Sequence, residues 1–510
     1  MPDLRMLADI TSDMVYDMAV VAKVCVRPLM RRVLDRETGT EETIPIPCGS
    51  TLESVCPSCA HKARVLRIQQ CAEGWHLDTD PYQPDDADQD QQDDQHEDQD
   101  DASERRVRST RRRQDAADLP RVDPEDRTIG RTFTSRKGRV YRPSMFLTLT
   151  LPSYGPITDG VPTRPSTYNY RRAAMDALLF PKLVDRFWQN LRRCAGYKVQ
   201  YFAAVEPQQR LAPHLHSAIR GAIPRQLLKQ VIRATYVQVW WPQCDRPVFV
   251  NRVPVWDGTG YIDPDTGEVL PTWDEALDAL AQDPDARPAH VMRFGSQSDI
   301  RGIIAPSEEA DRAIRYLTKY LTKAIAEPLA HETGGIEKRR QAHIDRMHAE
   351  LRWLPCSERC ANWLRYGVQP KDPTPGLEAG HCDSKAHDRE HLGVGGRRVL
   401  VSRHWSGKTL AEHKADRATV VRETLHAAGI VPPEVERLSA EVKASDGLPR
   451  YVWTDSRPKT PGEYRKIIFA AIRQRLAWRT QYDAAKIATA EAVENHSATD
   501  HSRGDDGPAP

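Results

Sequence analysis

The sequence predicts an α+β fold in which an antiparallel sheet is flanked by helices. Three runs read as strands, at 146–150, 201–206 and 213–221. Apolar residues recur at helical spacing over 170–194 and over 224–241. The order strand, helix, strand pair, helix is typical of a sheet covered on one face. We therefore expect one sheet domain in the middle of the chain.

Residues 311–326 read as a helix with two chemically different faces. On one side, an apolar stripe about 80° wide would pack on a core. On the opposite side, tyrosines and lysines form i,i+4 pairs that packing does not require. For this helix taken alone, the alternative is a solvated face with tyrosines lying along it. The apolar stripe is Ile314, Leu317, Leu321 and Ile325, and the opposite face is Tyr316, Lys319, Tyr320 and Lys323.

Two histidines lie two residues apart in the third predicted strand. Because side chains alternate along a strand, His214 and His216 point to the same face and could bind a metal ion together. Glu206 ends the preceding strand and is the third candidate ligand, with Gln208 and Gln209 as weaker candidates. The alternative is a pair of strand histidines that only make structural hydrogen bonds.

Composition and charge indicate a soluble protein with a polyanionic partner. Residues 78–104 contain 13 Asp or Glu and no Lys or Arg, so the rest of the chain carries a net charge of +14. The apolar run 18–26 is interrupted by Lys23 and is too short to span a bilayer, so we expect no membrane contact and a cytoplasmic location. In that compartment, the ten cysteines are expected to be metal ligands or free thiols.

Two cysteine clusters have spacings suited to structural zinc. The first contains a Cys-x2-Cys knuckle, with His61 or His76 as substitute ligands. The second has looser spacing, with His381 as the substitute for its histidine. Buried thiols without a metal are the alternative for both. The first set is Cys48, Cys56, Cys59 and Cys71, and the second is Cys356, Cys360, Cys382 and His387.

These features divide the chain into six regions. The acidic run and the arginines after it cannot bury enough apolar surface to fold and read as a disordered linker. The first forty residues read as one or two helices with a basic end. The regions are 1–77 with a four-cysteine zinc-ribbon-like module, 78–127 as the linker, 128–345 as the sheet domain with an insertion at 242–305, 346–430 as a Cys/His and basic DNA-contact region, 431–494 as a helical region, and 495–510 as a disordered tail.

The segment 405–409 has the Gly-Lys-Thr end of a phosphate-binding loop. The first glycine of that pattern is missing, because Ser402 stands in its place. We therefore reject an ATPase here and expect a separate helicase. Basic residues near this segment and in the helix 170–194 are expected to contact DNA phosphates instead. They are Arg171, Arg172, Arg397, Arg398, Arg403 and Lys408.

Together these motifs resemble the HUH endonuclease superfamily, which joins a His-hydrophobic-His metal site to tyrosine nucleophiles on a helix. The segment 316–323 is similar to the YxxxYxxK signature of the two-tyrosine class, and the strand 146–150 with the Leu-Pro-Ser-Tyr-Gly-Pro run after it resembles that class's first motif. The runs 360–370 and 395–402 resemble the replication initiators of actinomycete plasmids and integrative elements, the RepSA type. The resemblance covers residues 45–75 and 140–430.

The resemblance implies an HUH-type sheet and a metal-dependent nickase acting on single-stranded or extruded plasmid origin DNA. Tyr316 or Tyr320 would form a 5′-phosphotyrosine and leave a 3′-OH primer for the host polymerase, while Lys319 and Lys323 stabilise charge. Mn²⁺ or Mg²⁺ would be the catalytic ion, and Zn²⁺ the structural one. The alternatives are a relaxase or transposase of the same superfamily, and a non-catalytic, zinc-stabilised DNA-binding regulator.

Overall fold

The chain forms two compact units, which the computed structural model separates at Gln70 and Gly407. One unit joins both ends of the chain, Met1–Gln70 and Lys408–Pro510, and the other is the continuous stretch Cys71–Gly407. Most of the acidic segment that was expected to be a linker lies outside the described residues. Among the described helices, none is long and apolar enough to cross a membrane. The described residues are 11–77, 79–81, 115–138, 140–319, 321–322, 334–395, 398–427, 442–456 and 460–501.

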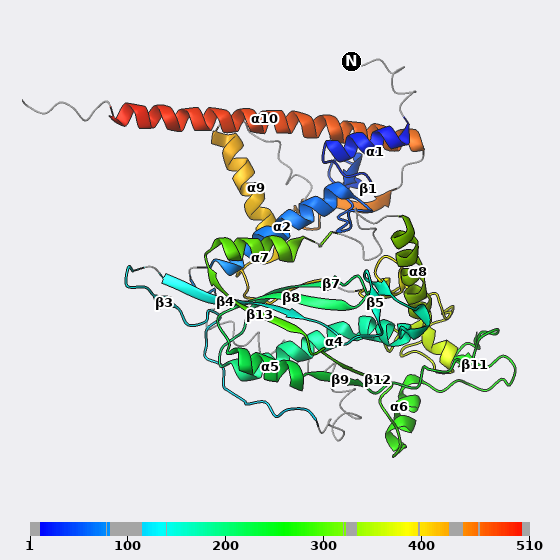
Figure 1. Ribbon diagram of the computed structural model, residues 1–510. Coiled ribbons are helices and arrows are strands. Elements are labelled where there is room, and N and C mark those ends of the chain that lie inside the picture. Colours follow the sequence, from blue (N-terminus) through cyan, green and yellow to red (C-terminus); the bar gives the residue numbers. More distant parts are fainter. Residues whose placement is uncertain are drawn as a thin grey trace, which may run out of the picture. The chain divides into compact units, whose positions relative to one another are not determined.

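An antiparallel sheet forms the centre of the unit Cys71–Gly407 (Figure 1). Its strands follow the order β13-β4-β8-β7-β14, with β3 paired to β4, and every pairing is antiparallel. Mixed helices and antiparallel sheet confirm the predicted α+β class. The strands are β3 (Phe133–Thr134), β4 (Val140–Leu149), β7 (Tyr201–Pro207), β8 (Pro213–Arg220), β13 (Ser298–Ala305) and β14 (Val399–Val401).

Helix α4 (Tyr170–Ala195) covers the apolar face of this sheet. Asn169 caps it by accepting a hydrogen bond from the Arg172 amide, and Gly196 ends it in the left-handed conformation with φ 71°. The apolar residues that predicted the helix are buried, and they form one core with Leu215 and Ile219 of β8. Burial of a continuous apolar stripe is what holds the helix on the sheet.

Helix α5 (Arg225–Ala234) packs against α4 and is shorter than the predicted helix 224–241. The chain leaves the helix at Thr235 and continues as β9 (Tyr236–Val239), which pairs with β12 (His290–Arg293). Alternating burial along Tyr-Val-Gln-Val fits a strand rather than a helix, and β-branched residues favour it.

The tyrosine helix is α7 (Glu308–Thr318), on the sheet face opposite to α4 (Figure 1). It begins three residues before the predicted start, because Ser307 caps it by accepting a hydrogen bond from the Ala310 amide and three acidic residues occupy its first turn. The predicted apolar stripe is buried at Ile314, Leu317 and Leu321. Ile325 lies outside the described residues.

The predicted insertion 242–305 holds small elements, but its last part belongs to the main sheet, because β13 is the sheet's edge strand next to β4. The Asp263–Glu268 stretch closes as a turn, with the Gly267 amide donating to the Asp263 carbonyl. The remaining elements of this unit are β5 (Ile157–Thr158), β6 (Val161–Pro162), the 3-10 helix Pro165–Thr167, β10 (Val255–Trp256), β11 (Tyr261–Ile262), α6 (Trp273–Gln282), α8 (Gly334–Leu351), and the 3-10 helices Ala361–Tyr366 and Lys385–His387.

The end of the predicted linker packs on this unit. The Val122 amide donates to the Arg193 carbonyl, Glu125 forms a parallel bridge with Tyr197, and the Lys198 amide donates to the Arg127 carbonyl. These backbone bonds extend the ordered unit to residues before 128. Composition alone could not show them, because the partners lie about seventy residues further along the chain.

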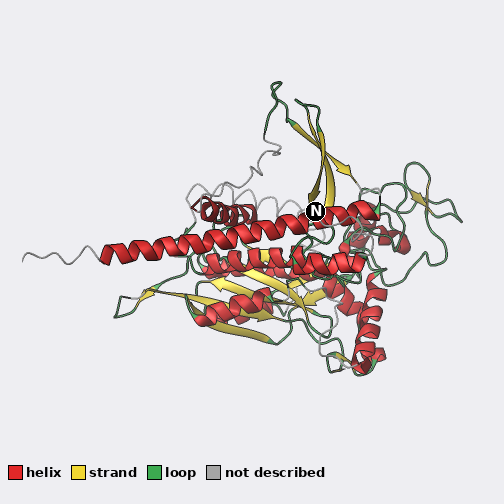
Figure 2. Cartoon of the chain, turned by 90° about the horizontal axis from the view of Figure 1, so that it is seen from above, coloured by secondary structure: helices red, strands yellow, loops and turns green. Residues whose placement is uncertain are grey.

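The other unit pairs the two ends of the chain in one sheet of order β15-β1-β2. The basic stretch expected to end a helix is strand β1, which is hydrogen-bonded on both sides. Figure 2 shows α10 as one unbroken helix, and it runs into the predicted tail as far as His501. The elements are α1 (Ser12–Val21), β1 (Leu29–Asp35), β2 (Glu41–Ile46), α2 (Pro57–Trp75, which continues past Gln70), α9 (Leu410–Ala427), β15 (Tyr451–Ser456) and α10 (Pro461–His501).

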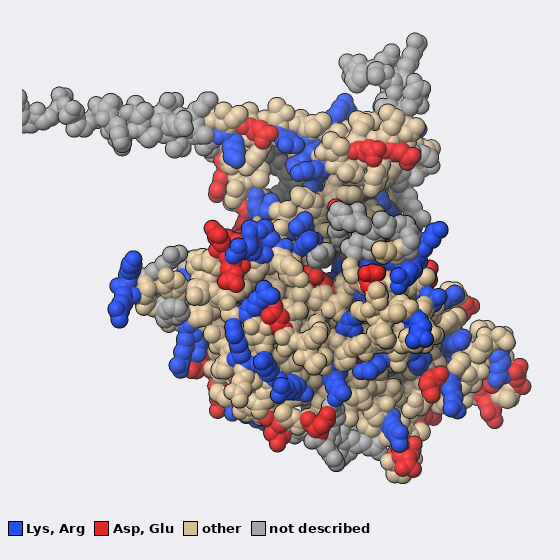
Figure 3. All heavy atoms as spheres, in the orientation of Figure 1, with Lys and Arg blue, Asp and Glu red and all other residues tan. Residues whose placement is uncertain are grey.

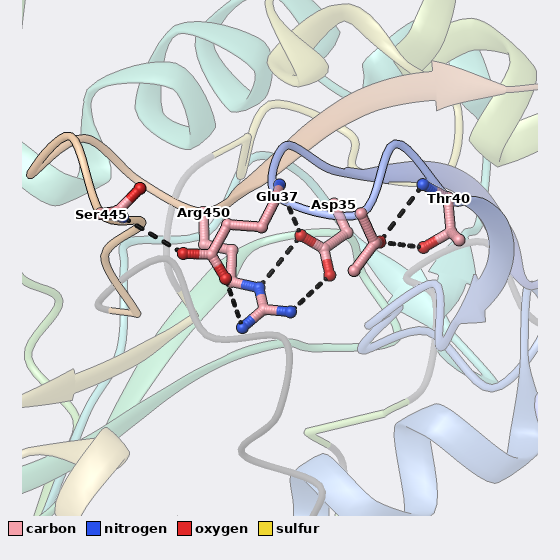
Figure 4. A network of polar contacts seen from close by, with 6 residues as sticks. Asp35, Glu37, Thr40, Ser445 and Arg450 are labelled. Carbon is pink, nitrogen blue, oxygen red and sulfur yellow. Dashed lines mark hydrogen bonds and ion pairs between the residues drawn. The ribbon is translucent and has the colours of Figure 1, made fainter.

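An arginine near the C-terminal end of the chain is held by two acidic residues near its N-terminal end (Figure 4). Arg450 donates to both carboxylate oxygens of Asp35, at 3.0 and 2.7 Å, and pairs with Glu37 at 2.8 Å. The Ser445 amide also donates to Glu37. The hydrogen bonds from Arg450 hold the pKa of Asp35 well below its usual range. A two-pronged contact of this kind fixes the register of β15 on β1.

We expect Arg450→Met to loosen this sheet, because Asp35 loses its main partner. Amide hydrogens of β1 and β15 should exchange faster, as measured by hydrogen exchange with mass spectrometry. Arg32→Met is the matched control, since Arg32 lies on β1 with Asp35 and its 3.3 Å pair with Glu41 is solvent-exposed. Equal acceleration in both variants would contradict the role given to Arg450.

Candidate active site and metal centres

The register of three neighbouring strands places the predicted metal ligands on one face of the sheet. Glu206 of β7 lies directly opposite His214 of β8, and His216 lies between Ala204 of β7 and Thr148 of β4. Directly paired residues point to the same side of a sheet. The strand register therefore brings together a carboxylate and two imidazoles, and the two histidines share a face as their spacing indicates.

The three side chains converge on a common point. The Nε2 atoms of His214 and His216 are 2.6 Å apart, and the nearer Glu206 oxygen is 4.0 and 3.7 Å from them. One ligand atom from each residue lies within 4.8 Å of the other two. Thr148 Oγ1 is 2.9 Å from His216 Nδ1, a hydrogen bond that turns Nε2 toward the cluster.

Burial keeps both imidazoles uncharged at neutral pH. It lowers the pKa of His214 to about 4 and that of His216 to about 3, and it raises the pKa of Glu206 to about 7 against the pull of Arg398 and Lys319. Neutral imidazoles offer lone pairs to a cation.

Two buried polar atoms of this cluster, Glu206 Oε1 and His214 Nδ1, lack a hydrogen-bond partner in the part of the chain that the structure describes. Leaving such an atom unsatisfied costs about 1–3 kcal/mol, a cost that a bound cation could offset at the carboxylate. The donor set of two imidazoles and one carboxylate suits a divalent transition ion. The residues present therefore fit a divalent metal ion.

Tyr316 projects from α7 onto this cluster. Its hydroxyl is 3.3 Å from His216 Nε2, and its ring meets the rings of His216 and Phe146 edge-on, with centroids 4.9 and 6.0 Å away. The side chain is 44 % exposed, so the hydroxyl combines a buried neighbour with access from solvent. Lys319, three residues later, is exposed and acts on Glu206 electrostatically.

Other predicted residues of the site are placed differently. Gln208 accepts a hydrogen bond from Arg210 at 2.7 Å, and the Gln209 side chain lies beside Gly160. Tyr320 and Lys323 lie outside the described residues.

Arg398, which was expected to hold DNA phosphates, has a contact within the protein. Its guanidinium donates to the Leu321 carbonyl at 3.0 Å, just after α7, and its charge acts on Glu206. Its backbone is tied to β7, since the Arg398 carbonyl accepts from the Val205 amide. Arg398 thus joins the end of the tyrosine helix to the strand that carries Glu206, a role that the sequence did not indicate.

The other cations proposed for DNA contact have different surroundings. Arg171 donates to the Cys244 carbonyl at 2.6 Å and is half-buried, as is Arg172 nearby on α4. Lys408 forms an exposed 2.8 Å pair with Asp416. Arg403 is exposed. Arg397 lies outside the described residues.

The first cysteine group differs from its prediction by one member. Cys48, Cys56 and Cys59 gather with Cys25, and ligand atoms of all four lie within 4.8 Å of one another. Cys71 is not part of this group, because α2 is continuous and places it about 18 Å further along the helix than Cys59. His61 and His76 do not belong to the group either. Cys25 was missed because it stands far from the knuckle in sequence.

The second cysteine group has the predicted members, Cys356, Cys360, Cys382 and His387. His387 Nδ1 donates to the Leu351 carbonyl at 2.7 Å, which leaves Nε2 facing Cys360 Sγ at 3.5 Å. The substitute His381 is exposed and pairs with Glu378 instead. Both the group of four cysteines and the group of three cysteines and one histidine could hold zinc, since tetrahedral sites of these compositions are typical of structural zinc.

Comparison with known proteins identifies the class. A family model described as RepSA, replication initiator protein, pSAM2, matches residues 11–474, which include the whole of one unit and most of the other. The match defines a replication initiator, and this supports a role in plasmid replication initiation, for which origin DNA must be bound. The chain belongs to the RepSA family. No match to a curated protein or to a solved structure was found.

We expect Cys25→Ser to remove one structural zinc, because a tetrahedral site loses a ligand. Elemental analysis of the purified protein should then show one zinc ion per chain, against two in the wild type. Cys71→Ala is the matched control and should keep both ions. If the Cys71 variant lost a zinc ion and the Cys25 variant kept both, Cys71 rather than Cys25 would be the fourth ligand, as the sequence predicted.

We expect Glu206→Ala to weaken Mn²⁺ binding by about tenfold or more, because the only carboxylate of the cluster is lost. Titration followed by the electron paramagnetic resonance of free Mn²⁺ measures this affinity. His381→Ala removes an exposed histidine away from the cluster and should leave the affinity unchanged. Unaltered Mn²⁺ binding in Glu206→Ala would mean that the ion binds elsewhere.

Proposed function

We propose that this chain is a rolling-circle replication initiator of the two-tyrosine HUH type. In this proposal it is a metal-dependent nickase and strand transferase that acts at a plasmid origin. The observation that carries the proposal is the 3.3 Å separation of the Tyr316 hydroxyl from His216 within the Glu206, His214 and His216 cluster. A tyrosine beside three convergent ligands is suited to attack on a phosphodiester. Membership of a replication initiator family supports DNA as the substrate.

The cluster would hold the divalent ion through Glu206, His214 and His216. When bound, the ion would polarise the non-bridging oxygens of the scissile phosphate. Thr148 of β4 hydrogen-bonds to the ring of His216, and Arg398, just before β14, hydrogen-bonds to the backbone after α7, so the ligand cluster and the end of the tyrosine helix are each held by the sheet. Preorganisation of this kind lowers the barrier because the groups need not move during the attack.

The proposed reaction exchanges one phosphodiester for another. The Tyr316 oxygen bonds to phosphorus and loses its proton, while the bond from phosphorus to the 3′-oxygen breaks and that oxygen gains a proton. Lys319, one turn along from Tyr316, would stabilise the phenolate and the charge on phosphorus. No nucleotide is consumed, which agrees with the missing glycine of the phosphate-loop pattern at 402. The products are a 5′-phosphotyrosine and a 3′-OH that primes the host polymerase.

A second tyrosine has a clear use in this scheme. After one round of synthesis the first tyrosine is still esterified, so a second nucleophile is needed to cut the regenerated origin. Tyr320 follows Tyr316 by four residues in the sequence, a spacing of one helical turn. We propose that the two tyrosines act in turn on the same bound strand, and that a host helicase unwinds the duplex.

We expect Tyr316→Phe and Tyr320→Phe each to keep partial nicking, while the double variant loses covalent product by about a hundredfold or more. The assay incubates protein, Mn²⁺ and labelled single-stranded fragments of the replicon, followed by a denaturing gel and protease treatment. The covalent band should also disappear with EDTA.

Tyr482→Phe on α10 is the matched control and should nick like the wild type. A persistent covalent band in the double Phe variant would contradict the assignment of Tyr316 and Tyr320 as the nucleophiles. Tight DNA binding without any covalent product, across several metals and replicon fragments, would instead indicate the zinc-stabilised DNA-binding regulator.

A further inference from the structure

Helix α5 carries a row of basic residues that neither the core nor the candidate active site uses. Arg225, Lys229 and Arg233 recur at every fourth position, so they lie within about 80° of one another on one side of the helix. All three are exposed, while Leu228, Val231 and Ile232 are buried against the core. We call Arg225, Lys229 and Arg233 the α5 basic stripe.

No acidic side chain neutralises the stripe from within the helix, because α5 contains none. Within the described ranges of the chain, none of the three residues forms an ion pair. Asp118 lies beside this helix, since its backbone carbonyl accepts a hydrogen bond from the Gln230 side chain at 3.1 Å. Three unpaired cations on one ridge repel one another slightly, so they favour an anionic partner over solvent.

The ridge continues at its C-terminal end onto α4. Asn190 donates to Thr235, the residue that ends α5, at 3.1 Å. Arg193, one turn after Asn190, is exposed and belongs to the last turn of α4. Figure 3 shows Lys and Arg side chains gathered over the region of α5. Arg193 thus adds an exposed cation on the helix against which α5 packs.

The spacing of the stripe suits a nucleic-acid backbone. Residues four apart on a helix are separated by about 6 Å along its axis, so the stripe spans about 12 Å. One strand of B-DNA presents a phosphate about every 3.4 Å along its axis, so three or four phosphates lie within that length. Long basic side chains on a rigid helix can reach phosphates without reading bases.

We propose that the α5 basic stripe binds the phosphate backbone of double-stranded DNA. The duplex would be the DNA that flanks the nicking site, so this inference rests on the proposed function. The stripe lies on the α4 side of the sheet, whereas Tyr316 and its metal ligands lie on the α7 side (Figure 1). Because the two surfaces lie on separate faces, the protein could remain bound to the duplex while a single strand is cut and transferred.

The chemistry favours a duplex over a single strand. Surfaces that bind single strands combine positive charge with aromatic side chains on which bases stack. The sequence of α5, Arg-Gln-Leu-Leu-Lys-Gln-Val-Ile-Arg-Ala, contains no aromatic residue. Cations without stacking platforms can neutralise phosphates in a regular array but cannot hold unpaired bases. The stripe therefore contributes affinity rather than sequence specificity.

The test replaces Arg225, Lys229 and Arg233 with Gln, which keeps a good helix former at each exposed position. Binding of a short labelled duplex of mixed sequence is measured by fluorescence anisotropy over a range of salt concentrations. We expect the variant to bind about tenfold or more weakly at 0.1 M salt, and the slope of log K against log salt to fall by about 2 to 3. A matched control replaces Arg473, Arg475 and Lys486 of α10 with Gln, which removes the same charge.

Two further measurements separate this inference from the proposed function. Covalent nicking of a single-stranded replicon fragment should be the same in the stripe variant and the wild type, which also shows that the variant folds. If the wild type never nicks, the proposed function fails. The comparison of duplex affinity between the stripe variant and the wild type still shows whether the α5 basic stripe binds duplex DNA. The inference is overturned if the stripe variant keeps wild-type duplex affinity and salt slope, if the α10 control loses as much affinity, or if only single-stranded binding falls.

Discussion

The pairing of β7 with β8 is the constraint on which the rest of the site depends. Glu206 faces His214 across this pair, and the same register sets His216 beside Thr148 of β4. A shift by one residue would turn both histidines into the apolar core and bring Leu215 to the surface, at a large cost in burial. The core under α4 therefore holds Glu206, His214 and His216 in position, although it contains none of them.

The two faces of this sheet differ in chemistry. One face is apolar and packs on α4, while the other carries Glu206 Oε1 and His214 Nδ1, two buried polar atoms without a hydrogen-bond partner in the described part of the chain. Burial of unsatisfied polar atoms destabilises a fold, so the stability of the sheet does not account for them. Two further hydrogen bonds support the site: Thr148 of β4 bonds to the His216 ring, and Arg398, just before β14, bonds to the Leu321 carbonyl in the segment after α7.

The second unit is organised by contacts between residues far apart in the sequence. β15 pairs with β1, Arg450 holds Asp35, and Cys25 joins the knuckle that begins α2. A core of α1 and α10 residues surrounds the Cys25 group. The described residues of this unit include few buried apolar side chains, so a structural zinc would contribute directly to its folding free energy.

The sequence by itself determined the α+β class, helix α4, the buried stripe of α7, the shared face of His214 and His216, and the group of three cysteines with His387. Each of these follows from local periodicity or close spacing. The tertiary structure decided the strand register, the joining of both chain ends in one sheet, the choice of Cys25 over Cys71, and the contact of Arg398 with Leu321. These depend on pairings across tens to hundreds of residues, where local preferences are the same for many possible partners and only burial in the complete fold selects one.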